Sequence, residues 1–522
     1  MSRSAAPEHT AAAAVRHQPR PPSATSRGTD PGPGGHCAPR GLKGILLTPQ
    51  ANESHRPLVA KLWLSPPSRY LPTGNRETRR PGRLHKGGSP VINLRLLWTW
   101  DHCAQWTAAR AGVHDWGASN EFSGNAEDFV REYSLLLRWC GQHGIDGVVV
   151  WGLLRDGHGG VEAAKRLCEV ADAAGVKLLA GVGLNAYGGV YYEGASEWSL
   201  DQHLNKYPEL YARRADGQRH IFQMPGNAPQ PFRHACPSRP ENMEYCLDGL
   251  RWLMETVPLA GVQVESGDTY VCECSLCRER RQNPISSQSW DDMAMFYGPA
   301  AEAVWSVRPG ATVILETYSH PQPVADGTTP GFGGGSPPWA PECVAQFPRG
   351  AYVQWVADYF SAPRNPVPWT TRAPEGFAGN IMRAHLATWW MARGEEVAVD
   401  WLALLAQQSL AHGFDGLSIF GEKSPFRTGC ELNYLALADY GSAANPEADL
   451  ASFLTRVAAP LLGGPERAME YLRLARCIAV PADLEGAMAQ ARRQAAQLSG
   501  RQADRWTWLA WYLSRWAYDA QG

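Results

Sequence analysis

Short runs of apolar residues alternate with longer amphipathic stretches between Val91 and Tyr440 of this chain. Each run has the length of a buried strand, and each longer stretch repeats its apolar positions every three to four residues, as an amphipathic helix does. Eight strands are therefore expected, at 93–100, 146–154, 176–184, 259–266, 311–318, 351–359, 379–390 and 414–422.

Helices are expected between these strands, and residues that favour helix ends mark some of their limits. Gly144 suits the C-terminal cap of one helix, and Pro240 suits the first turn of another. Eight apolar strands alternating with helices over about 350 residues predict an α/β fold, a (β/α)8 TIM barrel over 91–440, rather than an open doubly wound sheet. No glycine-rich nucleotide-binding fingerprint follows the first strand. The expected helices span 126–144, 161–175, 240–257, 293–310 and 395–413.

The first ninety residues differ from the barrel pattern. Residues 1–90 are rich in Pro, Gly, Ser, Arg and His and have few apolar residues to bury, so we expect a disordered extension. An alternative is that translation starts at Val91, because the Lys-Gly-Gly just before it is what a purine-rich ribosome-binding sequence would encode and Val is what a GTG start would encode.

The end of the chain is expected to be helical. Residues 441–522 contain several amphipathic stretches and no strand pattern, which indicates a small helical region packed on the barrel. Its expected docking face carries four tryptophans, Trp506, Trp508, Trp511 and Trp516.

Composition narrows the function classes. The 49 Lys and Arg residues nearly balance the 51 Asp and Glu residues, which gives no electrostatic case for a nucleic acid or a membrane as partner. No apolar run is long enough to span a membrane and no secretory signal is visible, so a cytoplasmic protein is expected. The 21 Trp residues are the unusual number. Tryptophan is mostly a core residue, but it also stacks on pyranose rings in sugar-binding clefts.

Polar and aromatic residues follow nearly every predicted strand. The reactive groups of a TIM barrel come from the C-terminal ends of its strands, so these residues would meet at one rim. Carboxylates that bind hydroxyls, together with aromatic rings that stack on sugars, favour an oligosaccharide or glycoside substrate. The candidate substrate-binding residues are Trp100, Asp101, His102, Trp151, Arg155, Asp156, His158, Tyr187, His320, Trp355 and Trp389.

Carboxylates at the same rim are the candidate catalytic groups. Cleavage of a glycosidic bond needs one group to protonate the leaving oxygen and another to attack or to activate water. Glu265 follows an apolar strand whose burial would raise its pKa, and Asp268 follows three residues later. Each also has a structural interpretation, Glu265 as an ion-pair partner of Arg155 and Asp268 as a turn cap. The second catalytic group is expected among Glu316, Asp358 and Glu422.

Three cysteines lie close together just after Glu265. Cys272, Cys274 and Cys277 would supply three thiols on one loop, and the fourth ligand of a tetrahedral zinc would be Cys236 or His234. A structural zinc is one interpretation. A reduced or disulfide-braced loop and a catalytic metal are the others. A thioredoxin-like redox site is disfavoured because the strand before the cysteines is of the wrong kind.

Three segments of the chain resemble a known family. The stretches YPELYARRADGQ, CPSRPENMEYCLDGLRWL and GVQVESGDTYVCECSLC are similar to a bacterial family of glycoside-hydrolase-like barrels of unknown function, which is distantly related to alpha-glucuronidases and beta-hexosaminidases. The later NPEADLASFLTRVAAPLLG resembles the helical tail of those proteins. The likeness is good over 200–280 and looser over 91–460.

The resemblance implies a (β/α)8 barrel that acts on a glycan. It places Glu265 and Asp268 where the wider group has its general acid, although the sequence Glu-Ser-Gly-Asp departs from the paired Asp-Glu or Asn-Asp of that group. We therefore expect a glycosidase that needs no cofactor for its chemistry. The alternatives are a carbohydrate-binding barrel without turnover and a zinc-dependent hydrolase.

Overall fold

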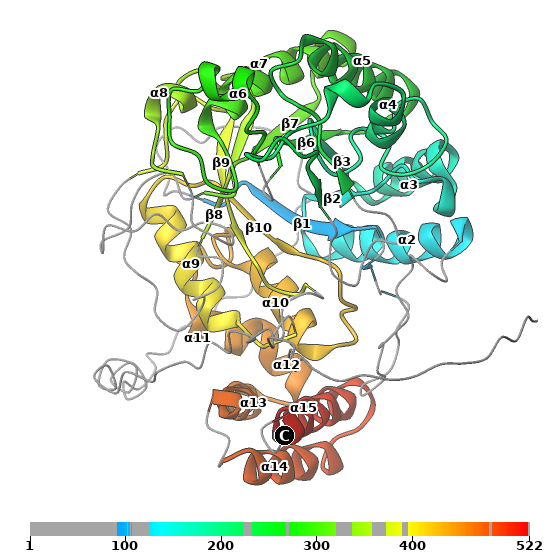
Figure 1. Ribbon diagram of the computed structural model, residues 1–522. Helices are drawn as coiled ribbons and strands as arrows, with labels where there is room; N and C mark the ends of the chain where they lie inside the picture. Colours follow the sequence, from blue (N-terminus) through cyan, green and yellow to red (C-terminus); the bar gives the residue numbers. More distant parts are fainter. Residues whose placement is uncertain are drawn as a thin grey trace, which may run out of the picture. The chain divides into compact units, whose positions relative to one another are not determined.

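Eight parallel strands close into a barrel, which confirms the predicted fold class. The computed structural model describes residues 91–519 apart from 102, 105, 107–124, 223–231, 268–270, 320–336, 358–371, 389–394 and 480–482. The two interpretations of residues 1–90 therefore lie outside the described residues. Each strand pairs with the next along the chain and the last pairs with the first (Figure 1). The strands are β1 (Leu94–Trp100), β2 (Gly147–Trp151), β3 (Lys177–Gly183), β6 (Gly261–Glu265), β7 (Thr312–Glu316), β8 (Tyr352–Val356), β9 (Gly379–Ala384) and β10 (Gly416–Phe420).

Helices cover the outside of this barrel. Those that follow its strands are α2 (Ala126–His143), α3 (Gly160–Ala174), α5 (Pro240–Thr256), α7 (Trp290–Val307), α8 (Pro341–Val344), α9 (Val399–Ala411) and α10 (Thr428–Asp439). Between β3 and α5 the chain makes a long excursion, which contains α4 (Leu200–Lys206) and the hairpin of β4 (Ile221–Phe222) and β5 (Phe232–Arg233). The short α6 (Ser275–Arg280) follows β6.

Helix ends form where the sequence provides caps. The side chain of Asn125 accepts hydrogen bonds from the amides of Glu127 and Asp128 at the start of α2. Gly144 ends the same helix with a φ of 80°, the left-handed conformation that glycine adopts without steric cost. Pro240 occupies the first turn of α5, as expected.

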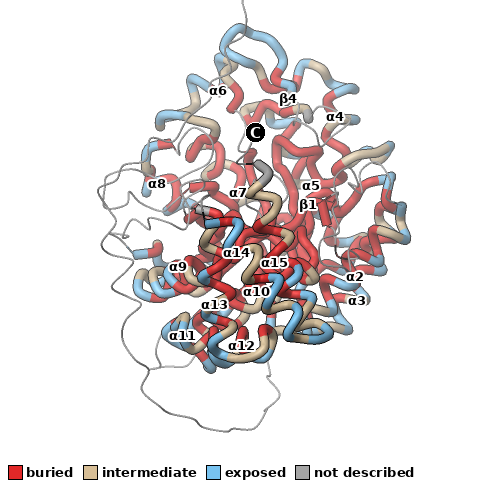
Figure 2. The backbone as a smooth tube through the Cα atoms, turned by 90° about the horizontal axis from the view of Figure 1, so that it is seen from below, coloured by how far each residue is buried: buried red, intermediate tan, exposed pale blue. Residues whose placement is uncertain are grey.

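Side chains alternate between two cores along each strand. Leu96, Trp98 and Trp100 of β1 point into the barrel, whereas Leu97 packs outward against the helices. In Figure 2 the chain through the barrel is almost wholly buried, and exposed residues lie mainly on the surrounding helices and loops. The inside of the barrel is thus a packed aromatic and polar layer, which is where the candidate site lies.

The C-terminal residues form helices that contact the barrel's last helices. They are α11 (Leu450–Phe453), α12 (Ala459–Leu462), α13 (Pro465–Ala475), α14 (Leu484–Ala496) and α15 (Gly500–Asp519), with a π-turn over Leu454–Ala458 and a 3-10 turn over Arg476–Ala479. Arg505 of α15 pairs in a bidentate manner with Glu431 of α10, with both N–O distances 2.7 Å. Trp506 and Trp508 are fully buried, and Trp511 and Trp516 are half-buried. Among the described helices, none is long and apolar enough to cross a membrane.

Candidate active site

Two glutamates lie side by side at the C-terminal ends of neighbouring strands. The register of β6 and β7 pairs Val264 with Leu315, so Glu265 comes level with Glu316 one residue later. The side chain of Gln263 points into the barrel, and Glu265, two residues on, faces the same way. The two residues are 2% and 1% exposed. Adjacent strands are about 4.8 Å apart, so the structure places two buried carboxyl groups next to each other.

Hydrogen bonds fix the carboxyl group of Glu316 from several directions. The side-chain amide of Gln263 donates to its Oε2 at 3.1 Å, and that of Gln354 donates to the same oxygen. The amide of Tyr318 donates to Oε1 at 2.8 Å. Gln263 also accepts a hydrogen bond of 3.2 Å from the indole of Trp151, which ties the carboxyl group to the aromatic interior. Glu316 is therefore held in one orientation.

Arg383 of β9 is the cation that faces Glu316. Its Nη1 lies 3.4 Å from Glu316 Oε2, and both side chains are fully buried. The guanidinium also lies over two aromatic rings. Its Cζ is 4.4 Å from the ring centroid of Tyr318 and 5.4 Å from the ring centroid of Trp98. A buried charge is tolerated only when it is paired, so Glu316 and Arg383 depend on each other.

Burial and charge act on the pKa of Glu316 in opposite directions. Removal from water raises the pKa of its carboxyl group above the usual value, while the charge of Arg383 and the hydrogen bonds of Tyr318 and Gln354 oppose that rise. The phenol of Tyr297 has a raised pKa, first because it is buried and then because of the charges of Glu265 and Glu316. Both carboxyl groups therefore act on the same buried phenol, whose hydroxyl donates to the backbone oxygen of Glu316.

Aromatic rings fill the inside of the barrel beside these carboxyl groups. The ring centroid of Trp100 lies 5.7 Å from that of Trp151, 5.7 Å from that of Tyr187 and 5.8 Å from that of Tyr192. The ring centroid of Trp98 lies 5.9 Å from that of Trp151. Trp100, Trp151 and Tyr187, which the sequence suggested as substrate-binding residues, are thus together in one cluster.

Three residues just beyond the barrel strands have a left-handed backbone. They are Tyr187 after β3, Tyr318 after β7 and Ala387 after β9, with φ of 49°, 50° and 60°. This conformation is unfavourable for residues other than glycine and is found often at functional sites. The same end of the barrel therefore carries both the buried carboxyl groups and the backbone strain.

Asp101 belongs to a different network. Its carboxylate accepts from Arg155 Nε at 2.7 Å and lies 3.1 Å from His158 Nε2. Arg155 also pairs with Glu193, so the expected alternative of an Arg155–Glu265 ion pair is replaced by pairs to Asp101 and Glu193. The guanidinium of Arg155 also lies over the ring of Tyr192, with Cζ 4.5 Å from the ring centroid, so this network borders the aromatic cluster. The network links β1 to the segment after β2.

Three further candidates make hydrogen bonds to other parts of the chain. Asp156 accepts from the hydroxyl of Tyr191 and, at 2.8 Å, from the amide of Ala195, contacts that hold a loop. Trp355 is fully buried, and its indole donates to Asn380 outside the barrel. Glu422 is buried and accepts from the amide of Trp100 at 3.1 Å.

Several predicted site residues fall outside the described residues. They are the catalytic candidates Asp268 and Asp358 and the substrate-binding candidates His102, His320 and Trp389. Their roles stay predictions.

The sequence reasoning missed the residues that hold Glu316. Arg383 and Gln263 are polar residues inside otherwise apolar strands, and nothing in the sequence places them in the site. A polar side chain at an inward position of a buried strand needs a partner. The sequence therefore shows that these polar residues need partners, but it does not show which residues the partners are.

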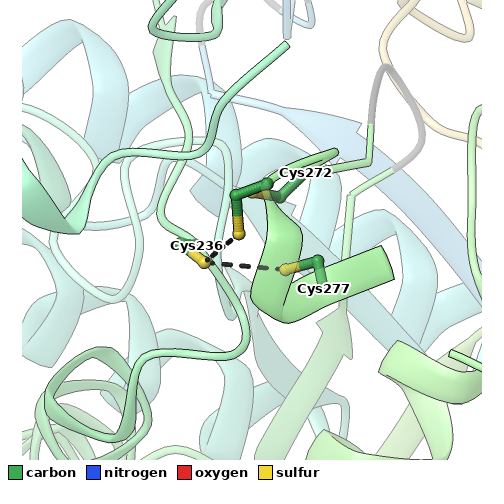
Figure 3. Close-up of side chains that lie close together, drawn as sticks. Cys236, Cys272 and Cys277 are labelled. Atoms are coloured by element: carbon green, nitrogen blue, oxygen red, sulfur yellow. Dashed lines mark hydrogen bonds between the residues drawn. The ribbon is translucent and has the colours of Figure 1, made fainter. Parts of the chain in front are cut away.

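The four expected cysteine ligands come together in space. The sulfurs of Cys236, Cys272, Cys274 and Cys277 all lie within 4.8 Å of one another. The sulfur of Cys236 is 3.6 Å from that of Cys274 and 3.6 Å from that of Cys277. Figure 3 shows Cys236, Cys272 and Cys277 gathered beside α6. The sequence thus identified a true cluster, although it left Cys236 and His234 as alternatives.

Comparisons with known proteins bear on the fold. No family model and no curated protein matches the chain. Solved structures similar to it include the Flavobacterium johnsoniae chitobiase, with 11% identity, 79% of this chain and 56% of that chain covered and a TM-score of 0.41. A glycoside hydrolase family 20 beta-N-acetylglucosaminidase has 11% identity, with 73% of this chain and 76% of that chain covered and a TM-score of 0.40. A maltogenic alpha-amylase from Thermotoga neapolitana has 12% identity, with 69% of this chain and 78% of that chain covered and a TM-score of 0.38.

Proposed function

We propose that this protein is a glycoside hydrolase that cleaves an oligosaccharide or glycoside at the C-terminal end of its barrel. The observation that carries the proposal is the buried pair Glu265 and Glu316 on adjacent strands, with Arg383 facing one of them. Glycoside hydrolysis uses two carboxyl groups in different environments. The aromatic cluster around Trp100 beside them has the chemistry to pack against sugar rings.

The two glutamates would have different roles. Glu316 is held by three hydrogen bonds and by Arg383, so it would be the fixed carboxylate that attacks the anomeric carbon as the nucleophile. Glu265, the last residue of β6, would protonate the leaving glycosidic oxygen and then take a proton from the water that hydrolyses the glycosyl-enzyme intermediate. Because the pair comes from adjacent strands, a separation of about 5 Å is expected, which is typical of enzymes that retain the anomeric configuration.

The test begins with turnover. Aryl glycosides, aryl uronides and N-acetylated aryl glycosides would be screened with the purified full-length chain. On the substrate that is cleaved, Glu265→Gln is expected to lower kcat by about 10²- to 10⁴-fold, the usual contribution of a general acid. Glu162→Gln is the matched control, because Glu162 is an exposed residue on α3 whose ion pair among the described residues is with Lys165. Its activity should equal that of the wild type.

Two results would overturn the proposal. One is the absence of cleavage across all three substrate classes by a protein that is folded by circular dichroism. The other is full activity in Glu265→Gln. Proton NMR of the first product formed would test the pairing of the glutamates separately, since inversion would exclude Glu316 as the nucleophile.

A further inference from the structure

We propose that Cys236, Cys272, Cys274 and Cys277 bind one structural zinc ion as four thiolates. The proposal is independent of the glycosidase assignment, because it rests on the cysteine cluster alone. Zinc bound by four ligands in a tetrahedron has Zn–S distances of about 2.3 Å, which places the sulfurs about 3.8 Å apart. The two sulfur–sulfur distances from Cys236 are both 3.6 Å, close to that spacing.

The sulfurs are too far apart for disulfides. A disulfide bond has an S–S length of about 2.05 Å, and the eleven cysteines that the structure describes are all free. Four buried or half-buried thiols without a bond need another reason to converge from separate parts of the chain. A soft metal ion supplies one, because thiolates bind zinc strongly.

The surroundings of the sulfurs are those of a thiolate site. The amide of Arg213 donates to the sulfur of Cys272 at 3.2 Å, and the hydroxyl of Ser238 lies 3.1 Å from the sulfur of Cys277. Such hydrogen bonds orient metal ligands and stabilise their charge. The guanidinium of Arg281 is nearly buried, and it donates to the backbone oxygen of Cys272 at 2.5 Å. Arg281 and Arg280 both pair with the single carboxylate of Asp292, so this group keeps one net positive charge beside the net charge of −2 that four thiolates give a zinc ion.

The site would fasten three segments of the chain together. Cys236 lies just before α5, Cys272 and Cys274 lie on the loop after β6, and Cys277 is in α6. The segment at Arg213 joins them, because its carbonyl oxygen accepts from the amide of Glu273 at 2.7 Å. The long excursion after β3 would therefore be tied to the loop that follows Glu265. With all four positions taken by cysteines, the ion has no open position for a substrate, so its role is structural.

Metal content tests the proposal directly. The full-length chain, purified without chelators and without a histidine tag, is expected to contain one zinc ion by inductively coupled plasma mass spectrometry. Cys272→Ser and Cys277→Ser should lose the zinc, whereas Cys477→Ser, which changes a cysteine outside the cluster, should keep it. A wild-type chain without zinc, or with iron in its place, would overturn the proposal.

A second measurement covers the case in which the serine variants do not fold. Wild-type protein would be depleted of metal under reducing conditions and loaded with cobalt(II). The intense visible bands and sulfur-to-metal charge-transfer bands of a tetrahedral tetrathiolate complex are expected. A spectrum of octahedral cobalt would contradict the site.

Limited trypsin digestion gives a readout of the structural role. The zinc-free chain should be cut faster at Arg278 and Arg280 in α6 than the zinc-loaded chain. Equal rates at these sites would show that the metal does not hold this segment. None of these three measurements depends on turnover, so failure of this proposal is distinguishable from failure of the proposed function.

Discussion

At the scale of single residues, the buried pair of Glu316 and Arg383 is the most consequential feature. Replacing one partner leaves an unpaired buried charge, which costs about 3–5 kcal/mol of folding free energy. We expect a loss of that size for Glu316→Gln and for Arg383→Met alone. The double variant should lose much less than the sum, because it contains no unpaired charge. Urea unfolding of the four proteins measures this coupling, and additive losses would show that the two side chains act independently.

The pKa of Glu316 predicts a second effect, on the pH dependence of stability. A carboxyl group whose pKa is higher in the folded state binds its proton more tightly there than in the unfolded chain. Its stabilising contribution is therefore complete below the ordinary glutamate pKa of about 4.3 and is lost as the pH rises through the raised value.

The measurement is a comparison across pH. The unfolding free energy of the wild type minus that of Glu316→Gln should decrease as the pH rises from about 4 toward neutrality. An increase over this range would show that Arg383 lowers the pKa of Glu316 more than burial raises it.

The sequence predicted some of these residues and not others, for a physical reason. Glu265 and Glu316 were recognisable because a carboxylate at the end of an apolar strand has a defined place in a barrel. Their relation to Arg383 was not, since 67 positions separate Glu316 from its cation and only the folded arrangement brings them together. Asp101 also follows a strand as predicted, but its pairing with Arg155 and His158 could not be read from the sequence.

At the scale of elements, apolar runs located all eight strands but extended too far. The strand expected at 146–154 is Gly147–Trp151, and that expected at 379–390 is Gly379–Ala384. Leu153 and Leu154 beyond β2 and Leu386 and Ala387 beyond β9 are also buried, so hydrophobicity does not mark where the pairing ends. The predicted limits of the helices agree better with the structure, as α2 and α5 show, because capping residues and prolines mark helix ends locally.

Two helical glycines give a matched prediction about packing. A Cβ on Gly429 of α10 would lie 2.1 Å from the backbone oxygen of Glu395 and 2.8 Å from the ring of Trp508, whereas a Cβ on Gly486 of α14 would meet nothing within 4 Å. Gly429→Ala should therefore reduce the unfolding free energy by about 1–3 kcal/mol, the usual cost of overpacking. Gly486→Ala should increase it by about 0.5–1 kcal/mol, the helix preference of alanine over glycine. Equal effects would mean that α15 does not press on α10 as described.

At the scale of the whole molecule, the barrel and the C-terminal helices share buried contacts. Arg505 of α15 and Glu431 of α10 form a buried ion pair. Arg476, among the C-terminal residues, forms ion pairs with Glu396 and Asp400 of the barrel. Elements joined by buried contacts unfold together. We expect one transition in thermal unfolding, with the same midpoint by far-ultraviolet circular dichroism and by tryptophan fluorescence.

A truncation provides the control for this prediction. A chain ending at Gly441 would expose the apolar faces on which the C-terminal helices pack, and we expect it to aggregate when expressed. A stable, monomeric truncated chain, or two separate transitions in the full chain, would show instead that the helices fold as a unit of their own.

The clustered indoles inside the barrel have an optical consequence. The ring centroids of Trp98, Trp100 and Trp151 lie between 5.5 and 5.9 Å apart, so their electronic transitions are expected to couple. Coupled indoles in a fixed, asymmetric arrangement give a strong signal in near-ultraviolet circular dichroism. The positive charge of the adjacent Arg383 guanidinium is expected to shift the energy of the electronic transition of the Trp98 indole. The protein therefore carries its own spectroscopic probe at the barrel interior, sensitive to a molecule bound beside Glu265 without any added label.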